Sequence, residues 1–298
     1  MPSSNGEIHA QEAKRISLRD RYRRFKNHLA TALALGAVLL VLAPLIAVLT
    51  YLVLKGIGSL NLAFLTKIPT PPGEVGGGMA NAIVGSGIIL LIGSVIGVPL
   101  GIGCGIFLAE YARGRFGNAI RFVSDVLNGV PSIVIGMAAY AIFVLRQSHY
   151  SAVAGGFALG IMMVPTIARS TEEMLLMVPH SIREAALGLG IPQWRSTLSI
   201  TLRTATAGVI TGVMLAFARV AGETAPLLFT TLGNAFWNFN INQATAALPL
   251  QIFSYALSPY DDWHRQAWAG ALVLIILIMG TVSVVRAVAK RGILSGAR

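Results

Sequence analysis

The chain has 298 residues, of which 55% are hydrophobic and only 12% are charged, and its mean hydropathy is +0.70. Soluble globular proteins carry about 25% charged residues, so the composition excludes an ordinary soluble domain as well as a disordered chain. The single cysteine, Cys104, excludes a disulfide-rich secreted scaffold. The formal net charge of +11 has two explanations: nucleic-acid binding, or the basic bias of cytoplasmic loops in membrane proteins.

Residues 1–27 are polar and basic and are expected to form a cytoplasmic tail. The apolar run that follows is longer than the apolar region of a secretory signal, which favours an uncleaved membrane anchor. The basic residues beside the membrane would attract anionic lipid. A solvated tail that only fixes the topology explains the same residues.

Six stretches are long and apolar enough to cross the hydrocarbon core, which takes about 20 helical residues. They predict an all-α, polytopic membrane protein with a transmembrane domain over residues 28–288 and a cytoplasmic tail over 289–298. The third and fifth stretches also contain charge or proline. The expected spans are 28–54, 80–110, 119–145, 151–168, 204–232 and 266–288.

The basic residues lie mostly on one side of these spans. Most of the 23 precede the first span, occupy the second and fourth connections, or follow the last span. This alternation places both termini in the cytoplasm of a cell membrane protein. It explains the net charge without nucleic acid, which is not expected as a partner.

Motifs for catalysis are missing from the sequence. There is no G-x-x-x-x-G-K-[ST] run for nucleotide hydrolysis, and the five histidines have no spacing suited to a metal. Gly101, Gly103 and Gly105 lie within a predicted span, where close helix packing explains them better than a phosphate cradle. We therefore expect a transport protein with no catalytic residues, no metal and no cofactor bound by this chain.

The segment 169–203 is predicted to be helical without crossing the membrane. Residues 170–173 and 181–184 both fit the capping box [ST]-x-x-[DE] at a helix start. The pattern predicts a helix, a break, a short helix, a second break and another helix along the membrane face. The residues expected to mark the breaks are Pro179, Gly188, Gly190 and Pro192.

Part of this segment resembles the EAA loop of ABC-transporter permeases. The matching residues are Glu184, Ala185 and Ala186, then Gly190, then Ile200-x-Leu202; Arg203 stands where the family has proline. The resemblance implies a type I ABC importer permease fold. It also implies that 169–203 is a cytoplasmic coupling loop, whose short helix seats in a separate ATPase subunit that carries the ATP.

Two charged residues, Arg219 and Glu223, lie inside the fifth predicted span. A charge at mid-membrane costs at least about 2.5 kcal/mol, so these side chains should face a protein interior or a wet cavity. Their i, i+4 spacing would put both on one helical face, although arginine before glutamate is the weaker order for a structural pair. Both a structural ion pair and a binding site remain open.

The chemistry of this pair suits an oxyanion. A guanidinium binds oxyanions well. Glu223 would either pair with a basic residue of a partner subunit or accept a proton-bearing oxygen, and the second role favours protonated phosphate over sulfate. Thr224 adds a hydroxyl group beside it. Gly222 and Pro226 would loosen the helix here, which is tolerated at this depth only where the backbone is buried or lines water.

Four runs are similar to phosphate-specific permeases of the PstA type within the same superfamily: 76–87, 129–136, 169–174 and 218–230. This resemblance implies that Arg169, Arg219 and Glu223 matter for translocation. It further implies a heterodimer with a second permease, two ATPase subunits and an extracytoplasmic phosphate-binding protein.

Three alternatives remain. A related permease for sulfate, molybdate or phosphonate would share the coupling loop. A secondary anion carrier is a different mechanistic class, although no internal repeat is evident. An intramembrane enzyme is disfavoured by the lack of a nucleophile, base or metal set. The fold of the external segment 234–265 is left open.

Overall fold

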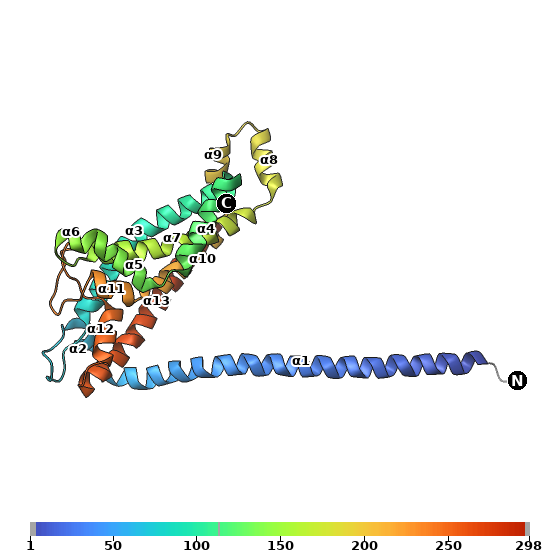
Figure 1. Ribbon diagram of the computed structural model, residues 1–298, viewed down its shortest axis with the longest axis horizontal. Coiled ribbons are helices and arrows are strands. Elements are labelled where there is room, and N and C mark those ends of the chain that lie inside the picture. Colours follow the sequence, from blue (N-terminus) through green and yellow to red (C-terminus); the bar gives the residue numbers. More distant parts are fainter. Residues whose placement is uncertain (1–3, 113, 296–298) are drawn as a thin grey trace. The chain divides into compact units, whose positions relative to one another are not determined.

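The computed structural model describes the backbone of residues 4–112 and 114–295, and the side chains of 20–112 and 114–289 (Figure 1). Within these ranges the chain is helical and has no β-strand, only an isolated bridge between Leu232 and Thr245. The all-α prediction is confirmed. The chain divides into two compact units, Met1–Leu54 and Lys55–Arg298, which are described separately.

The first unit consists of one long helix, α1 (Ser4–Gly56), which ends just beyond it. The helix begins well before the expected first span, since residues 7–35 hold neither glycine nor proline to interrupt it. Its part from Asp20 onward is a candidate membrane span, with a mean hydropathy of 2.8 in its most apolar window. The basic residues from Arg21 to Lys26 are therefore helical.

Four helices of the second unit are also long and apolar enough to cross a membrane, and one bent pair brings the total to as many as six in the described part of the chain. They include α3 (Ala80–Glu110), α7 (Ala152–Leu176) and α13 (Asp261–Ser295). The fourth is the stretch Gln193–Ala221. The predicted six crossings are reached if the bent pair counts as one span.

The third predicted span is bent rather than straight. It consists of α4 (Gly114–Gly129) and a second piece, Ser132–Gln147, which meet at an angle of 101°. Pro131 lies at the break with an extended backbone, and a proline has no N–H with which to continue the helix. The second piece runs through α5 (Ser132–Ala139), the π-helix η2 (Tyr140–Val144) and α6 (Leu145–Gln147).

The centre of the second unit is the pairing of α3 with α7. Glycines of α3 let the two backbones approach closely: a Cβ on Gly101 would lie 2.6 Å from the Ile167 Cβ, and one on Gly105 would lie 2.5 Å from the Thr171 Cβ. The predicted packing role is confirmed for these two glycines. Gly103 would meet nothing within 4 Å, so it faces away from this interface.

The fifth predicted span is also interrupted. The helix α10 (Leu202–Ala221) stops before Gly222, and α11 (Ala225–Thr230) starts three residues later. α11 packs against both α5 and α7. The approach to α5 is close, because a Cβ on Gly136 would lie 2.6 Å from the Pro226 Cα.

The two ends of the second unit differ in structure (Figure 1). One end, here called the α8 end, carries α8 (His180–Gly188), α9 (Gln193–Ser196) and the π-helix η3 (Thr197–Thr201). The other, the α2 end, carries the 3-10 turn η1 (Ile57–Ser59), α2 (Leu62–Thr66), α12 (Leu248–Ala256) and the start of α13. The segment 234–265 is therefore irregular at first and then helical in α12.

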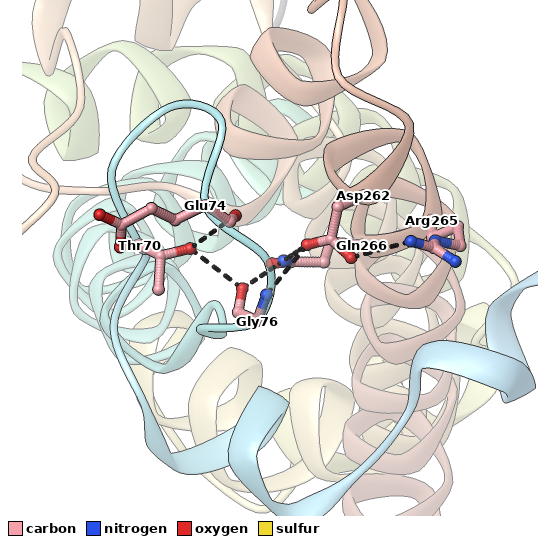
Figure 2. A network of polar contacts seen from close by, with 6 residues as sticks. All are labelled: Thr70, Glu74, Gly76, Asp262, Arg265 and Gln266. Atoms are coloured by element: carbon pink, nitrogen blue, oxygen red, sulfur yellow. Dashed lines mark hydrogen bonds and ion pairs between the residues drawn. The ribbon is translucent and has the colours of Figure 1, made fainter.

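A polar network closes the loop between α2 and α3 at the α2 end. Figure 2 shows Gly76 at its centre: its N–H donates to the Asp262 carboxylate at 3.2 Å, and its carbonyl accepts from Gln266 Nε2 at 2.6 Å. The Thr70 hydroxyl donates to the same carbonyl at 3.1 Å. Gly76 has φ +103°, which a residue with a side chain rarely adopts.

Candidate functional site

The segment 169–203 follows the predicted order of helix, break, short helix, break and helix. Its first and last helices, however, are parts of the candidate spans Ala152–Leu176 and Gln193–Ala221, so only α8 is a separate helix as predicted. The predicted capping boxes are wrong. Ser170 lies inside α7 and does not start a new helix. The helix continues past it to Leu176, and its buried residues, such as Leu175, pack against the protein as far as that end. α8 begins after Pro179, which makes no side-chain cap, and Ser181 is already within the helix.

The short helix α8 presents most of the EAA residues to the outside. Glu184 and Ala185 are exposed, whereas Ala186 is buried against the body of the protein. The exposed Gly190 has φ +76° and turns the chain just after the helix. Leu187 in the same helix is 51% exposed, so the accessible surface of α8 is both apolar and acidic.

On its inner side α8 is fastened by an apolar contact and an ion pair. Ile182 packs on a buried cluster that includes Leu175 and Val209. The Arg183 guanidinium lies 3.0 Å from the Glu110 carboxylate, and it also donates to the Leu175 carbonyl at 2.6 Å. α8 is therefore tied to the ends of α3 and α7.

A second ion pair, with a buried acid and a partly exposed arginine, lies near the same end. The Arg121 Nε of α4 donates to the Glu172 carboxylate of α7 at 2.6 Å, and another nitrogen of Arg121 donates to the Leu108 carbonyl of α3. In the sequence, Arg121 and Arg183 are explained by membrane topology alone, and neither Glu110 nor Glu172 was predicted as a partner for them. The sequence held one signal for the first pair: Glu110 ends an apolar span, and Arg183 directly precedes the EAA residues.

The second candidate region is the interruption between α10 and α11. Arg219 lies in the last turn of α10, while Glu223 and Thr224 lie in the break. The prediction that Arg219 and Glu223 share one helical face is wrong, because the helix ends at Ala221. Gly222 then caps the helix, and Pro226 cannot donate the hydrogen bond that would continue it.

The side chains of this region are not bound to each other. Arg219 is exposed, Glu223 and Thr224 are half-buried, and among the described side chains no ion pair joins Arg219 to Glu223. Both charged groups are thus available to a ligand or to another subunit. Interrupted helices leave backbone polar groups free, and within a membrane these must be buried or line water.

Arg169 is placed apart from that break. It lies on α7, two turns before its end, and pairs with Glu173 at 2.8 Å, with both side chains about half exposed. The structure therefore brings Arg169 to an acid of its own helix. In the described residues, no three His, Cys, Asp or Glu side chains gather closely enough to hold a metal ion.

Comparisons with known proteins agree with this architecture. Residues 101–292 match the family described as "Binding-protein-dependent transport system inner membrane component". The chain is 46% identical over 259 residues to the phosphate transport system permease protein PstA of Yersinia pestis, covering 87% of this chain and 88% of that protein. It is also 46% identical to PstA of Pasteurella multocida, covering 86% and 92% of the two chains.

A solved structure shows the same fold. The MetNI methionine ABC transporter in an inward-facing conformation contains a chain that aligns with a TM-score of 0.56, covering 74% of this chain and 98% of that one. The sequence identity is 16%, so the likeness concerns the fold alone. It confirms the predicted type I ABC importer permease fold.

Proposed function

This chain belongs to the family of binding-protein-dependent transport system inner membrane components, and on this premise we propose that it is the membrane-spanning permease subunit of an ATP-driven phosphate importer. One observation carries the proposal: identity of 46% over 87% of the chain with a permease named for phosphate transport. The chain itself forms half of the translocation pathway and hydrolyses no ATP.

The break between α10 and α11 is the proposed contact with phosphate. The exposed Arg219 guanidinium offers paired donors to an oxyanion. Glu223, in the break, accepts a hydrogen bond from a protonated phosphate oxygen, which fully ionised sulfate lacks. The Thr224 hydroxyl is a further donor in the same break, and Arg169 offers positive charge elsewhere on the proposed pathway.

The α8 end is the proposed contact with the ATPase. Glu184 and Ala185 are exposed, and Glu184 also lines the cavity between α8 and the ends of α3, α7 and α9. Gly190 turns the chain after them, and the buried Ala186 lets α8 lie close to the body. We assign the nucleotide to this separate ATPase subunit. Its closure would move α8 and switch the pathway between two global states, as coupling between sites requires.

The complete assembly follows from this assignment. It comprises this chain, a second permease as heterodimer partner, two ATPase subunits on the cytoplasmic side and an extracytoplasmic phosphate-binding protein. Both termini would then be cytoplasmic, and the α2 end would face the binding protein. The basic helix residues before the first span would lie beside anionic lipid.

The chief competing function is import of another oxyanion by the same mechanism. The test is uptake of labelled phosphate by proteoliposomes that hold the complete complex, with sulfate, molybdate and a phosphonate as competitors. We expect phosphate to be taken up and the other anions to compete weakly. Preferred uptake of sulfate, molybdate or the phosphonate would overturn the substrate assignment.

Two substitutions extend this test to the site. Arg219→Gln should abolish uptake while the complex still assembles, because the anion loses its cationic partner. Glu223→Gln should weaken the discrimination against sulfate. Arg115→Gln is the matched control, since Arg115 is an exposed arginine outside both candidate regions. Normal uptake by the Arg219→Gln complex would remove Arg219 from the pathway.

A further inference from the structure

α8 is not held to the body of the protein by close packing over its whole inner side. A cavity of about 280 Å³ lies between α8 and the ends of α3, α7 and α9. Its lining includes Glu110, Arg183, Leu187 and Thr197. Besides the apolar contact of Ile182 and the buried Ala186, α8 reaches the ends of α3 and α7 through the polar contacts of Arg183.

The charged contact among these is the pair Arg183–Glu110. The Glu110 side chain is 7% exposed and the Arg183 side chain 13%, so the pair is largely removed from water. Glu110 is the last residue of α3, where an acid is unfavourable because a helix C-terminus is itself negative. The guanidinium compensates both the carboxylate and the Leu175 carbonyl near the end of α7.

Glu110 also connects to the helix that leads into α10. Its backbone carbonyl accepts a hydrogen bond from Gln193 Nε2 of α9 at 3.1 Å. From α9 the chain continues through η3 into α10, the helix that carries Arg219. The end of α3 is thus a junction between α8 and the span with the candidate site.

A buried ion pair is a weak source of stability, because apolar residues of similar volume often stabilise a fold as well or better. What the pair does supply is a fixed geometry between α8 and the ends of α3 and α7. We propose that Arg183 and Glu110 are positioning residues for coupling: they make the ends of α3 and α7 follow α8 when a partner displaces it. This inference rests on the proposed function, in which that partner is an ATPase.

The experiment uses the complete complex in proteoliposomes and measures labelled inorganic phosphate taken up per ATP hydrolysed. The key variant is the double substitution Glu110→Gln with Arg183→Met, which removes both charges and leaves neither one buried alone. We expect the double variant to assemble and to hydrolyse ATP. The phosphate taken up per ATP should fall at least about fivefold, because the free energy that couples two sites typically corresponds to a factor of about five or more. Arg115→Gln is the control that changes one exposed arginine on the same side of the membrane.

Each outcome decides the proposal. An unchanged ratio of uptake to hydrolysis in the assembled double variant would overturn it, and so would failure of that variant to assemble, since the pair would then be needed for structure. If the unmodified complex takes up no phosphate with ATP, the proposed function fails instead. A reduced ratio in the double variant with a normal ratio in the control would support the positioning role.

Discussion

The interface of α3 with α7 and the attachment of α8 are held in opposite ways. Along α3 and α7, glycines bring two backbones so close that a Cβ at Gly101 or Gly105 would overlap its neighbours. α8 instead stands beside a cavity and is tied by the buried pair Arg183–Glu110. Close backbone packing resists displacement everywhere along its length, whereas a few charged contacts fix a position and still allow an element to move as a unit.

The largest expected effect on structure is at the attachment of α8. Glu110→Ala would leave the Arg183 charge buried without its partner, which costs about 3–5 kcal/mol. Amide hydrogens of α8 should then exchange about 100- to 4,000-fold faster, since each 1.4 kcal/mol is a factor of ten. Hydrogen exchange on the purified subunit in detergent measures this. Glu74→Ala is the control, because Glu74 is an exposed acid. Equal exchange in the unmodified protein, Glu110→Ala and Glu74→Ala would contradict the role given to the pair.

The next effect concerns the glycine interface. Gly101→Leu must displace Ile167, so it should lower the free energy of unfolding by about 1–3 kcal/mol or more. Gly103→Leu makes the same change on the same helix where nothing lies within 4 Å, and it should be nearly neutral. Denaturant unfolding in detergent separates the two. Equal losses of stability would mean that α3 and α7 do not pack through these glycines.

A smaller effect is expected at the network of Figure 2, where the contacts are hydrogen bonds near the surface. Asp262→Ala removes the acceptor for the Gly76 N–H, while Gln266 still binds the Gly76 carbonyl. We expect a loss of about 1 kcal/mol and faster proteolysis of the loop between α2 and α3. Asp261→Ala is a close control, because both acids lie in the first turn of α13. Similar proteolysis of the two variants would argue against the network.

The smallest structural effect is expected at the exposed pair of α7. Arg169→Gln breaks a contact between half-exposed side chains four residues apart, which contributes about 0.3–0.5 kcal/mol. Unfolding should therefore barely change, and any large loss of phosphate uptake would reflect a role in transport. A loss of stability comparable to that of Glu110→Ala would show that exposure does not distinguish the two pairs.

Much of the fold was predictable because the lipid-facing and buried parts of a span are both apolar, and length alone identifies them. The helix order around α8 also followed from local residues such as Pro179 and Gly190. The bend at Pro131 and the break after Ala221 were less accessible, because a proline or glycine in a span permits an interruption without requiring one. α5 follows the bend at Pro131 and α11 follows the break after Ala221, and these two helices pack against each other.

The residues of the candidate site remain a prediction, whereas the geometry predicted for them is wrong. Arg219 and Glu223 stood out as charges in an apolar span, yet their helical spacing gave the wrong relation between them. Glu110 and Arg183 escaped notice because each has an ordinary explanation in the sequence, the end of a span and a basic loop. Only the approach of α8 to the end of α3 shows that the two residues meet.

The most direct test of the account is whether phosphate movement through this chain depends on ATP and on α8. Vesicles holding the complete complex should accumulate labelled phosphate only when ATP is supplied to the ATPase side. Replacing Glu184 with alanine should greatly reduce that accumulation while the permease still inserts into the membrane. Phosphate accumulation by this chain without ATP, or unchanged accumulation with the Glu184→Ala subunit, would contradict the account.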